Sequence, residues 1–100
     1  MLGFFSKSEA SGYRPSPDVT ASEHGGGLVL LDHARGAVHT SNPVGARIWR
    51  GLDAGEPLEA IASSIARDFG VADSVARADA GRFVDELRAA GLLVAGGRRG

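Results

Sequence analysis

Residues 42–49 read NPVGARIW, and the apolar pattern of the chain changes its period within this stretch. Asn42 is a favoured residue for a helix N-cap, and Pro43 suits the first helical position, where its missing N–H costs nothing. After Asn42 the apolar residues recur about every 3.6 positions, whereas before it they alternate or form short runs. We therefore predict strands before this stretch and helices after it.

Three helices are predicted in the second half of the chain. We expect Leu92 to fold back onto Leu87, in the contact that accompanies a glycine-terminated helix. Capping and turn residues mark the helix ends: Asn42 and residues 53–55 for the first, Pro57 and Gly70 for the second, and Asp73 and Gly91 for the third. The apolar stripes assigned to the core are Val44, Ile48, Trp49 and Leu52, then Leu58, Ile61, Ala62, Ile65 and Phe69, then Ala76, Ala80, Phe83, Val84 and Leu87.

Three short antiparallel strands are predicted in the first half, at residues 19–23, 28–32 and 37–40, with a glycine turn at 25–27. Residues 1–17 are predicted to be a flexible N-terminal arm, residues 18–95 the folded domain and residues 96–100 a flexible tail. The order of elements indicates an α+β domain of winged-helix-like shape, in which a three-stranded antiparallel sheet is followed by three helices.

The apolar run at residues 28–31 has two faces, because only alternate residues of a strand point toward the helices. If Val29 and Leu31 face the core, Leu28 and Leu30 form an apolar patch on the open side of the sheet. Such a patch is expected to be covered by a second copy of the chain, by a partner enzyme, or by an aromatic residue of the arm, namely Phe4, Phe5 or Tyr13.

The composition excludes several classes of protein. The chain has 100 residues, of which 43% are hydrophobic and 23% charged, with a net charge of -1 and no cysteine, so disulfides and thiolate metal sites are excluded. No apolar run approaches the ~20 residues that cross a bilayer, and no secretory signal pattern opens the chain. We expect no membrane association and a cytoplasmic location. The acidic balance and the scattered arginines also argue against nucleic acid as a partner.

No set of residues suggests catalysis. A nucleophile needs a neighbouring base and an orienting third group, and the sequence offers no such arrangement. The three histidines, His24, His33 and His39, lack the closely spaced partners of a zinc site. A chain of this length also has little room for an enclosed catalytic chamber beside its core. We therefore predict no catalytic residue, no metal site and no cofactor.

The last predicted strand and the third helix each carry an unusual feature. Residues 37–40 contain no proline or permanent charge to block a sheet edge, and an unblocked edge accepts an extended peptide as an added strand. The alternative is that another strand, a helix or the N-terminal arm covers this edge. Gly81 is unfavourable inside a helix, so either something approaches it closely or it is tolerated on a solvated face.

The stretch from Leu28 to Leu93 resembles the PqqD-like family, whose members are also called RiPP recognition elements. RiPP denotes a ribosomally made and post-translationally modified peptide. The resemblance rests on LLD at residues 30–32 followed by Gly36, on NPVGARIW at 42–49, on LD at 52–53 and on FVDELRAAGLL at 83–93. It extends over the predicted domain apart from the first strand.

The resemblance implies a non-catalytic domain that holds the leader segment of a precursor peptide between its third strand and third helix, antiparallel to the sheet. It also implies a separate modifying enzyme as partner, such as a radical S-adenosylmethionine maturase or a leader peptidase. Carried onto this chain, the peptide-binding residues are Ala37, Val38, His39 and Thr40 on the strand and Ala78, Gly81, Arg82, Asp85 and Ala89 on the helix.

The chain departs from the family pattern in two ways. Ser41 stands where the family usually has leucine, which implies a looser join between the sheet and the first helix. The chain also lacks the Arg-rich first strand and the Pro-Glu turn of dedicated pyrroloquinoline quinone pathways, which favours another peptide pathway, such as a lasso peptide or a radical S-adenosylmethionine system. A winged-helix DNA-binding regulator is the alternative, although the third helix carries more carboxylates than arginines. A homodimer that exchanges strands across the hinge at residues 25–27 is a third reading.

Overall fold

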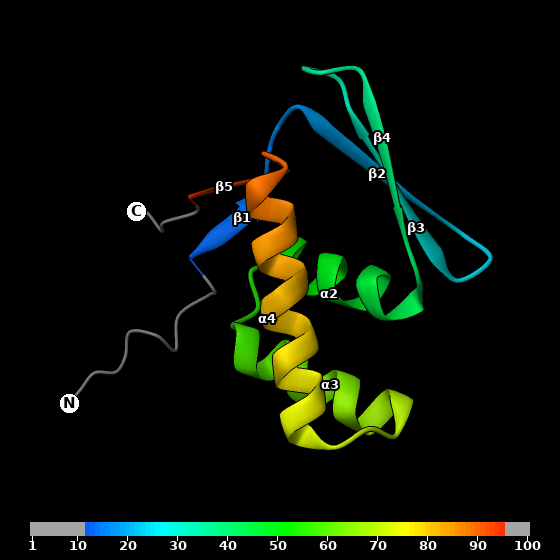
Figure 1. Ribbon diagram of the computed structural model, residues 1–100, viewed down its shortest axis with the longest axis vertical. Helices are drawn as coiled ribbons and strands as arrows, with labels where there is room; N and C mark the ends of the chain where they lie inside the picture. Colours follow the sequence, from blue (N-terminus) through cyan, green and yellow to red (C-terminus); the bar gives the residue numbers. More distant parts are fainter. Residues whose placement is uncertain (1–11, 96–100) are drawn as a thin grey trace.

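A computed structural model describes residues 12–95 of the protein as two small sheets and three helices (Figure 1). Strands β2, β3 and β4 form an antiparallel sheet in that order, and helices α2, α3 and α4 follow it, which confirms the predicted α+β class. The elements are β1 (Tyr13–Pro15), β2 (Val19–His24), β3 (Gly27–Asp32), β4 (Ala37–Ser41), α2 (Pro43–Asp53), α3 (Leu58–Phe69), α4 (Asp73–Ala89) and β5 (Leu93–Ala95).

The second sheet, β1 paired antiparallel with β5, was not predicted, and it corrects the boundary of the N-terminal arm. Residues 13–15 belong to the folded part of the chain rather than to a flexible arm. They lie across from residues 93–95, and the N–H of Ser16 donates to the carbonyl of Leu92 at 2.9 Å. Strands of three residues are too short to show a period of two, so the sequence pattern carries no sign of them. Phe4, Phe5 and the predicted tail at 96–100 lie outside the described residues.

Most helix boundaries follow the predicted capping residues. The Oδ1 atom of Asn42 accepts a hydrogen bond from the N–H of Gly45 at 2.9 Å, and Gly70 ends α3 in the left-handed conformation at φ 68°. The prediction that Asp73 caps α4 is wrong, because Ala72 occupies the N-cap position and makes no side-chain cap. Asp73 instead lies in the first turn, where a carboxylate still interacts favourably with the helix dipole.

The C-terminal end of α4 adopts the predicted glycine-terminated turn. Gly91 has a φ of 77°, its N–H donates to the carbonyl of Arg88, and the N–H of Leu92 donates to the carbonyl of Leu87 at 2.9 Å. This pair of hydrogen bonds is the Schellman motif, which satisfies carbonyls that the end of a helix leaves free. Leu92 is buried as a result and leads the chain directly into β5.

The core lies between the sheet and the helices. On the sheet side it is formed by Leu28 and Leu30, not by Val29 and Leu31. Leu28 and Leu30 are 1% and 2% exposed, whereas Leu31 points to the open side of the sheet. The outer apolar row is therefore Leu31 with Val38, which is its partner on β4. Phe69, assigned to the core, is also exposed, because it lies in the last turn of α3 beside Gly70, at the outer end of the helix pair.

Candidate functional site

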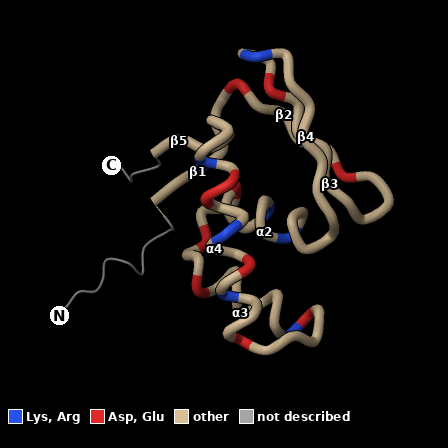
Figure 2. The backbone as a smooth tube through the Cα atoms, in the orientation of Figure 1, with Lys and Arg blue, Asp and Glu red and all other residues tan. Residues whose placement is uncertain are grey.

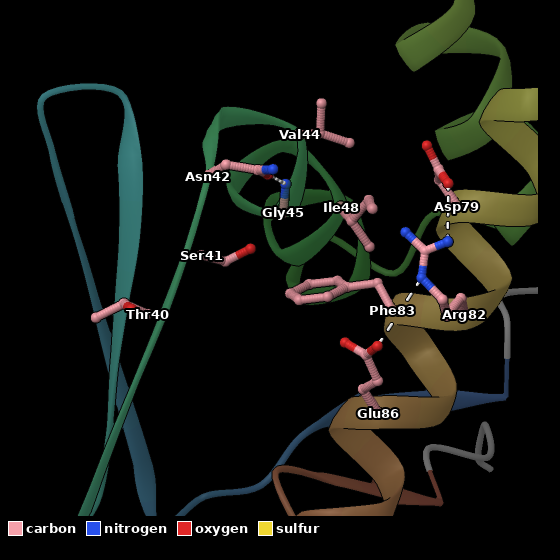
Figure 3. Close-up of a pocket in the computed structure, with 10 residues that line it drawn as sticks. All are labelled: Thr40, Ser41, Asn42, Val44, Gly45, Ile48, Asp79, Arg82, Phe83 and Glu86. Carbon is pink, nitrogen blue, oxygen red and sulfur yellow. Dashed lines mark hydrogen bonds and ion pairs between the residues drawn. The ribbon is translucent and has the colours of Figure 1, made fainter.

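Strand β4 forms one edge of the three-stranded sheet, and no strand among residues 12–95 pairs with its outer side. The close-up in Figure 3 shows β4 between the rest of the sheet and α4, with the start of α2 closing one end of the space. An unpaired edge presents main-chain N–H and C=O groups that another extended chain can use. The identity of the residues whose groups are free follows from the register.

The turn between β2 and β3 sets the hydrogen-bonding phase of the sheet. Gly25 and Gly26 both have positive φ, as a two-residue turn of type I′ requires, so His24 and Gly27 form a hydrogen-bonded pair. Such pairs alternate with non-hydrogen-bonded pairs along antiparallel strands. The N–H of His33 donates to the carbonyl of Asp18 at 2.9 Å, which continues the same series at the far end of the strands.

This phase assigns the free groups of β4. Gly27, Val29 and Leu31 direct their main-chain groups toward β2, so the alternate residues of β3 direct theirs toward β4. The partners of those alternate residues on β4 are Ala37, His39 and Ser41. Val38 and Thr40 consequently direct their N–H and C=O groups outward, away from β3. These two residues hold the main-chain groups that an added strand would use.

A cavity of about 270 Å³ lies at the end of this edge, between β4, the first turn of α2 and one face of α4 (Figure 3). Hydroxyl and amide groups line its strand side, apolar side chains its floor and charged side chains its α4 side. The lining residues are Thr40, Ser41 and Asn42, then Val44, Gly45 and Ile48 from α2, and Asp79, Arg82, Phe83 and Glu86 from α4.

The charged wall on α4 is only partly compensated. Arg82 forms an ion pair with Asp79 at 3.0 Å and another with Glu86 at 3.9 Å, as the dashed lines in Figure 3 show. Residues three and four apart on a helix are neighbours, so the arginine is shared between two carboxylates one turn to either side. The wall therefore carries one excess negative charge, and the guanidinium of Arg82 is held between the two carboxylates.

Close packing at the start of α2 gives the cavity its shape. A Cβ atom placed on Gly45 would lie 2.7 Å from the Cβ of Ser41 and 3.2 Å from the ring of Phe83. Glycine at this position lets the first turn of α2 approach the end of β4 and the middle of α4 together. The small Ser41 side chain fits against Gly45.

The structure places the predicted peptide-binding residues in three groups. Thr40 and Arg82 line the cavity, and Val38, which is 62% exposed, lies two residues before Thr40 on the free edge. Ala37 and His39 belong to the alternate set of β4 that faces the helices and pairs with β3. The remaining four residues lie on α4 outside the cavity lining, on the stripe beside Arg82: Ala78, Gly81, Asp85 and Ala89.

Of the four α4 residues that line the cavity, the sequence predicted Arg82 as part of the site but not Asp79, Phe83 or Glu86. The helical spacing of Phe83 places it on the predicted core stripe, and Asp79 and Glu86 suit weak ion pairs with Arg82 under the reading in which Gly81 lies on a solvated face. The lining face is thus turned toward the core by comparison with the predicted stripe. One available signal was the spacing of Asp79, Arg82, Phe83 and Glu86, since residues at i, i+3, i+4 and i+7 share one face of a helix.

The charge pattern bears on the alternative of nucleic-acid binding. Figure 2 shows acidic and basic residues interspersed along α4 rather than a basic stripe. Arg82 and Arg88 are both engaged with carboxylates of the same helix. A helix that enters a groove of DNA needs uncompensated positive charge to displace phosphate counterions. Within residues 12–95, no cluster of three metal-binding side chains occurs and no helix is long and apolar enough to span a bilayer.

Comparison with known proteins gives one family and two similar structures. The sequence profile of the PqqD family, described as coenzyme PQQ synthesis protein D, matches residues 27–93. The structure of TbiB1 in complex with the TbiA(beta) leader peptide has a TM-score of 0.76 and 27% identity, over 86% of this chain and 99% of that chain. Lasso peptide synthetase B1 complexed with the leader peptide has a TM-score of 0.76 and 24% identity, over 83% and 98%. No curated protein sequence matches the chain.

Proposed function

The chain belongs to the PqqD family, and on this premise we propose that it binds the leader segment of a ribosomally made precursor peptide as an added strand along β4. The bound leader would lie between β4 and α4, antiparallel to β4. The similar structure of TbiB1 holds a leader peptide, which supports this choice of ligand over nucleic acid. We propose a non-catalytic role in which the protein holds the precursor for a separate modifying enzyme, such as a leader peptidase or a radical S-adenosylmethionine maturase.

The observation that carries the proposal is the outward direction of the main-chain groups of Val38 and Thr40, beside a cavity. Strand addition derives affinity from main-chain hydrogen bonds and selectivity from pockets that take alternate side chains. The β4 edge supplies the first requirement, and the cavity supplies the second. Every second side chain of an added strand would point toward the helices, so one of them would enter the space above Ile48 and Phe83.

The lining indicates which side chain suits the cavity. Val44, Ile48 and Phe83 offer apolar contact, while Thr40, Ser41 and the ion-paired α4 wall offer hydrogen-bonding groups at the mouth. An amphipathic side chain with an apolar body and a polar end, such as tyrosine, fits both. Ala78, Gly81, Asp85 and Ala89 would then meet the parts of the leader that rise out of the cavity over the exposed side of α4.

The test compares two proline variants on opposite edges of the same sheet. Val38→Pro removes an N–H that faces the proposed leader and takes no part in pairing with β3, so the sheet should persist. Ala21→Pro is the matched control, because Ala21 has the same phase on the outer edge of β2. Leader affinity is measured by isothermal titration calorimetry. The amide chemical shifts of the protein are followed by NMR as the cognate leader peptide is added. The loss of one main-chain hydrogen bond should weaken binding about fivefold to tenfold.

We expect weaker leader binding for Val38→Pro and unchanged binding for Ala21→Pro. The amide signals of residues 37–41 and 78–89 should move in the wild-type titration. The proposal is wrong if folded Val38→Pro binds the leader as the wild type does, or if the shifts are confined to β2 and α3.

A further inference from the structure

A buried carboxylate lies at the end of β3, beneath the turn that leads into β4. Asp32 is only 1% exposed, and its Oδ1 atom accepts hydrogen bonds from the N–H groups of Ala34 and Arg35 at 3.0 and 3.3 Å. Its Oδ2 atom accepts a hydrogen bond from the Arg35 guanidinium at 3.0 Å. A buried carboxylate is retained only when it is well hydrogen-bonded and paired, as this one is. These hydrogen bonds tie the β3–β4 turn to Asp32 and hold the Arg35 side chain, which is 60% exposed, against the carboxylate.

The Arg35 guanidinium reaches across to the end of α4. A Cβ atom on Gly91 would lie 2.6 Å from both terminal nitrogens of Arg35 and 2.8 Å from its Cζ atom. The planar guanidinium therefore packs on the bare backbone of Gly91, just beyond the last carbonyls of the helix. A cation at this end interacts favourably with the helix dipole. Figure 1 shows the β3–β4 turn and the C-terminal end of α4 at the same end of the molecule.

This contact joins two elements that otherwise meet mainly through a third. The sheet packs on α2, which in turn packs on α3 and α4, while direct packing between β4 and α4 is sparse. Beside the cavity, the start of α2 holds β4 and α4 together through Ser41, Gly45 and Phe83. At the other end of β4, Asp32, Arg35 and Gly91 form the corresponding connection, which we call the latch.

We propose that Arg35 is a positioning residue that sets the separation of β4 and α4, and thereby the affinity for an extended peptide between them. Arg35 does not line the cavity and acts through Asp32 and Gly91. With the latch in place, the two walls of the site are held at both ends before the peptide arrives. Such preorganisation lowers the ordering that binding itself must impose. The affinity part of this proposal rests on the proposed function, whereas the spacing part does not.

The experiment measures spacing and affinity separately in Arg35→Met, which keeps an unbranched apolar stem and removes the charged guanidinium. The chain has no cysteine, so Ser22→Cys and Arg77→Cys place two unique spin labels, one on the sheet and one on α4, away from the cavity. Double electron–electron resonance then measures the distance between the two labels, with and without leader peptide. Arg67→Met is the matched control, because Arg67 is an exposed arginine whose partners Asp68 and Ser64 lie on α3 itself.

We expect a broader distance distribution for free Arg35→Met that narrows when leader binds, with an unchanged distribution for Arg67→Met. If the competent spacing falls to about a tenth of the population, leader affinity falls about tenfold. Arg35→Lys, which restores the charge but not the planar group, should recover part of the loss. Wild-type spacing and affinity in folded Arg35→Met would overturn the proposal. Absence of leader binding by the wild type would instead refute the proposed function, and the distance distributions would still test the latch.

Discussion

At the scale of single residues, the contact of Gly45 with Ser41 makes a sharp prediction about stability. Gly45→Ala improves helix propensity, but the new methyl group would lie 2.7 Å from the Cβ of Ser41, which rotation of a hydroxyl cannot relieve. We expect a net loss of about 1–3 kcal/mol in the free energy of unfolding, the usual cost of overpacking. Urea unfolding followed by circular dichroism measures it.

Two further variants test the cause of that loss. Ser41→Gly removes the Cβ and the hydroxyl oxygen that the methyl group of Gly45→Ala would meet. The double variant should therefore be more stable than the sum of the two single changes predicts. Gly81→Ala is the contrasting substitution, because a Cβ atom there would meet nothing within 4 Å. It should stabilise the protein by about 0.5–1 kcal/mol. Additive behaviour of Ser41 and Gly45 would contradict the close approach at the start of α2.

At the scale of elements, the edge strand predicts a pattern in the peptide that binds to it. Val38 and its partner Leu31 form an apolar row on the outer face of the sheet, and a strand added beside β4 would place a side chain next to Val38. Cross-strand pairs of this kind contribute about 0.2–1 kcal/mol each. Val38→Thr keeps the branched shape and the free N–H, so it should weaken leader binding by a small factor.

A double-mutant cycle between Val38→Thr and successive leader positions identifies the neighbour of Val38. One apolar position should show coupling, and the two flanking positions, which point to the other face, should show none. Val71→Thr is the matched control, since Val71 is an exposed valine in the α3–α4 turn. Equal affinity losses for Val38→Thr and Val71→Thr would argue against a strand in this register.

The elements also show how far the sequence alone reaches. Asn42, Gly70 and Gly91 act through local backbone chemistry, so the helix ends that they mark were predictable. The unblocked edge at residues 37–40 was also predictable, because the lack of proline and permanent charge is a property of the local sequence. The cavity face of α4 was not, because Phe83 is apolar and half-buried, and only the position of α2 decides whether it belongs to the core or to a cavity. The β1–β5 pair joins distant parts of the chain and leaves no local pattern.

At the scale of the whole molecule, the proposed site is a space between two bodies rather than a pocket within one. The sheet and α4 are brought together by α2 at one end of β4 and by the latch at the other. Affinity then depends on residues that never touch the peptide, because they hold the two walls at a fixed spacing. Both the stability of the fold and the geometry of the site consequently depend on the buried carboxylate of Asp32.

Acid unfolding tests that shared role. Burial alone would raise the pKa of Asp32, but hydrogen bonds from the Arg35 side chain and from the N–H groups of Arg35 and Ala34 outweigh it, so the pKa lies below the ordinary value of 3.8. A carboxyl whose pKa is lower in the folded state stabilises the fold above its unfolded pKa, and that stabilisation is lost as the pH falls through the folded value.

Asp32→Asn should therefore be less stable than the wild type at neutral pH, and the difference should shrink below pH 3.8. Urea unfolding across this range measures it, and Asp85→Asn, which removes an exposed carboxylate of α4, is the control. If the difference in unfolding free energy between Asp32→Asn and the wild type were the same at every pH, the charge of the carboxylate would contribute nothing to stability. The contact between Asp32 and Arg35 would then depend on packing alone.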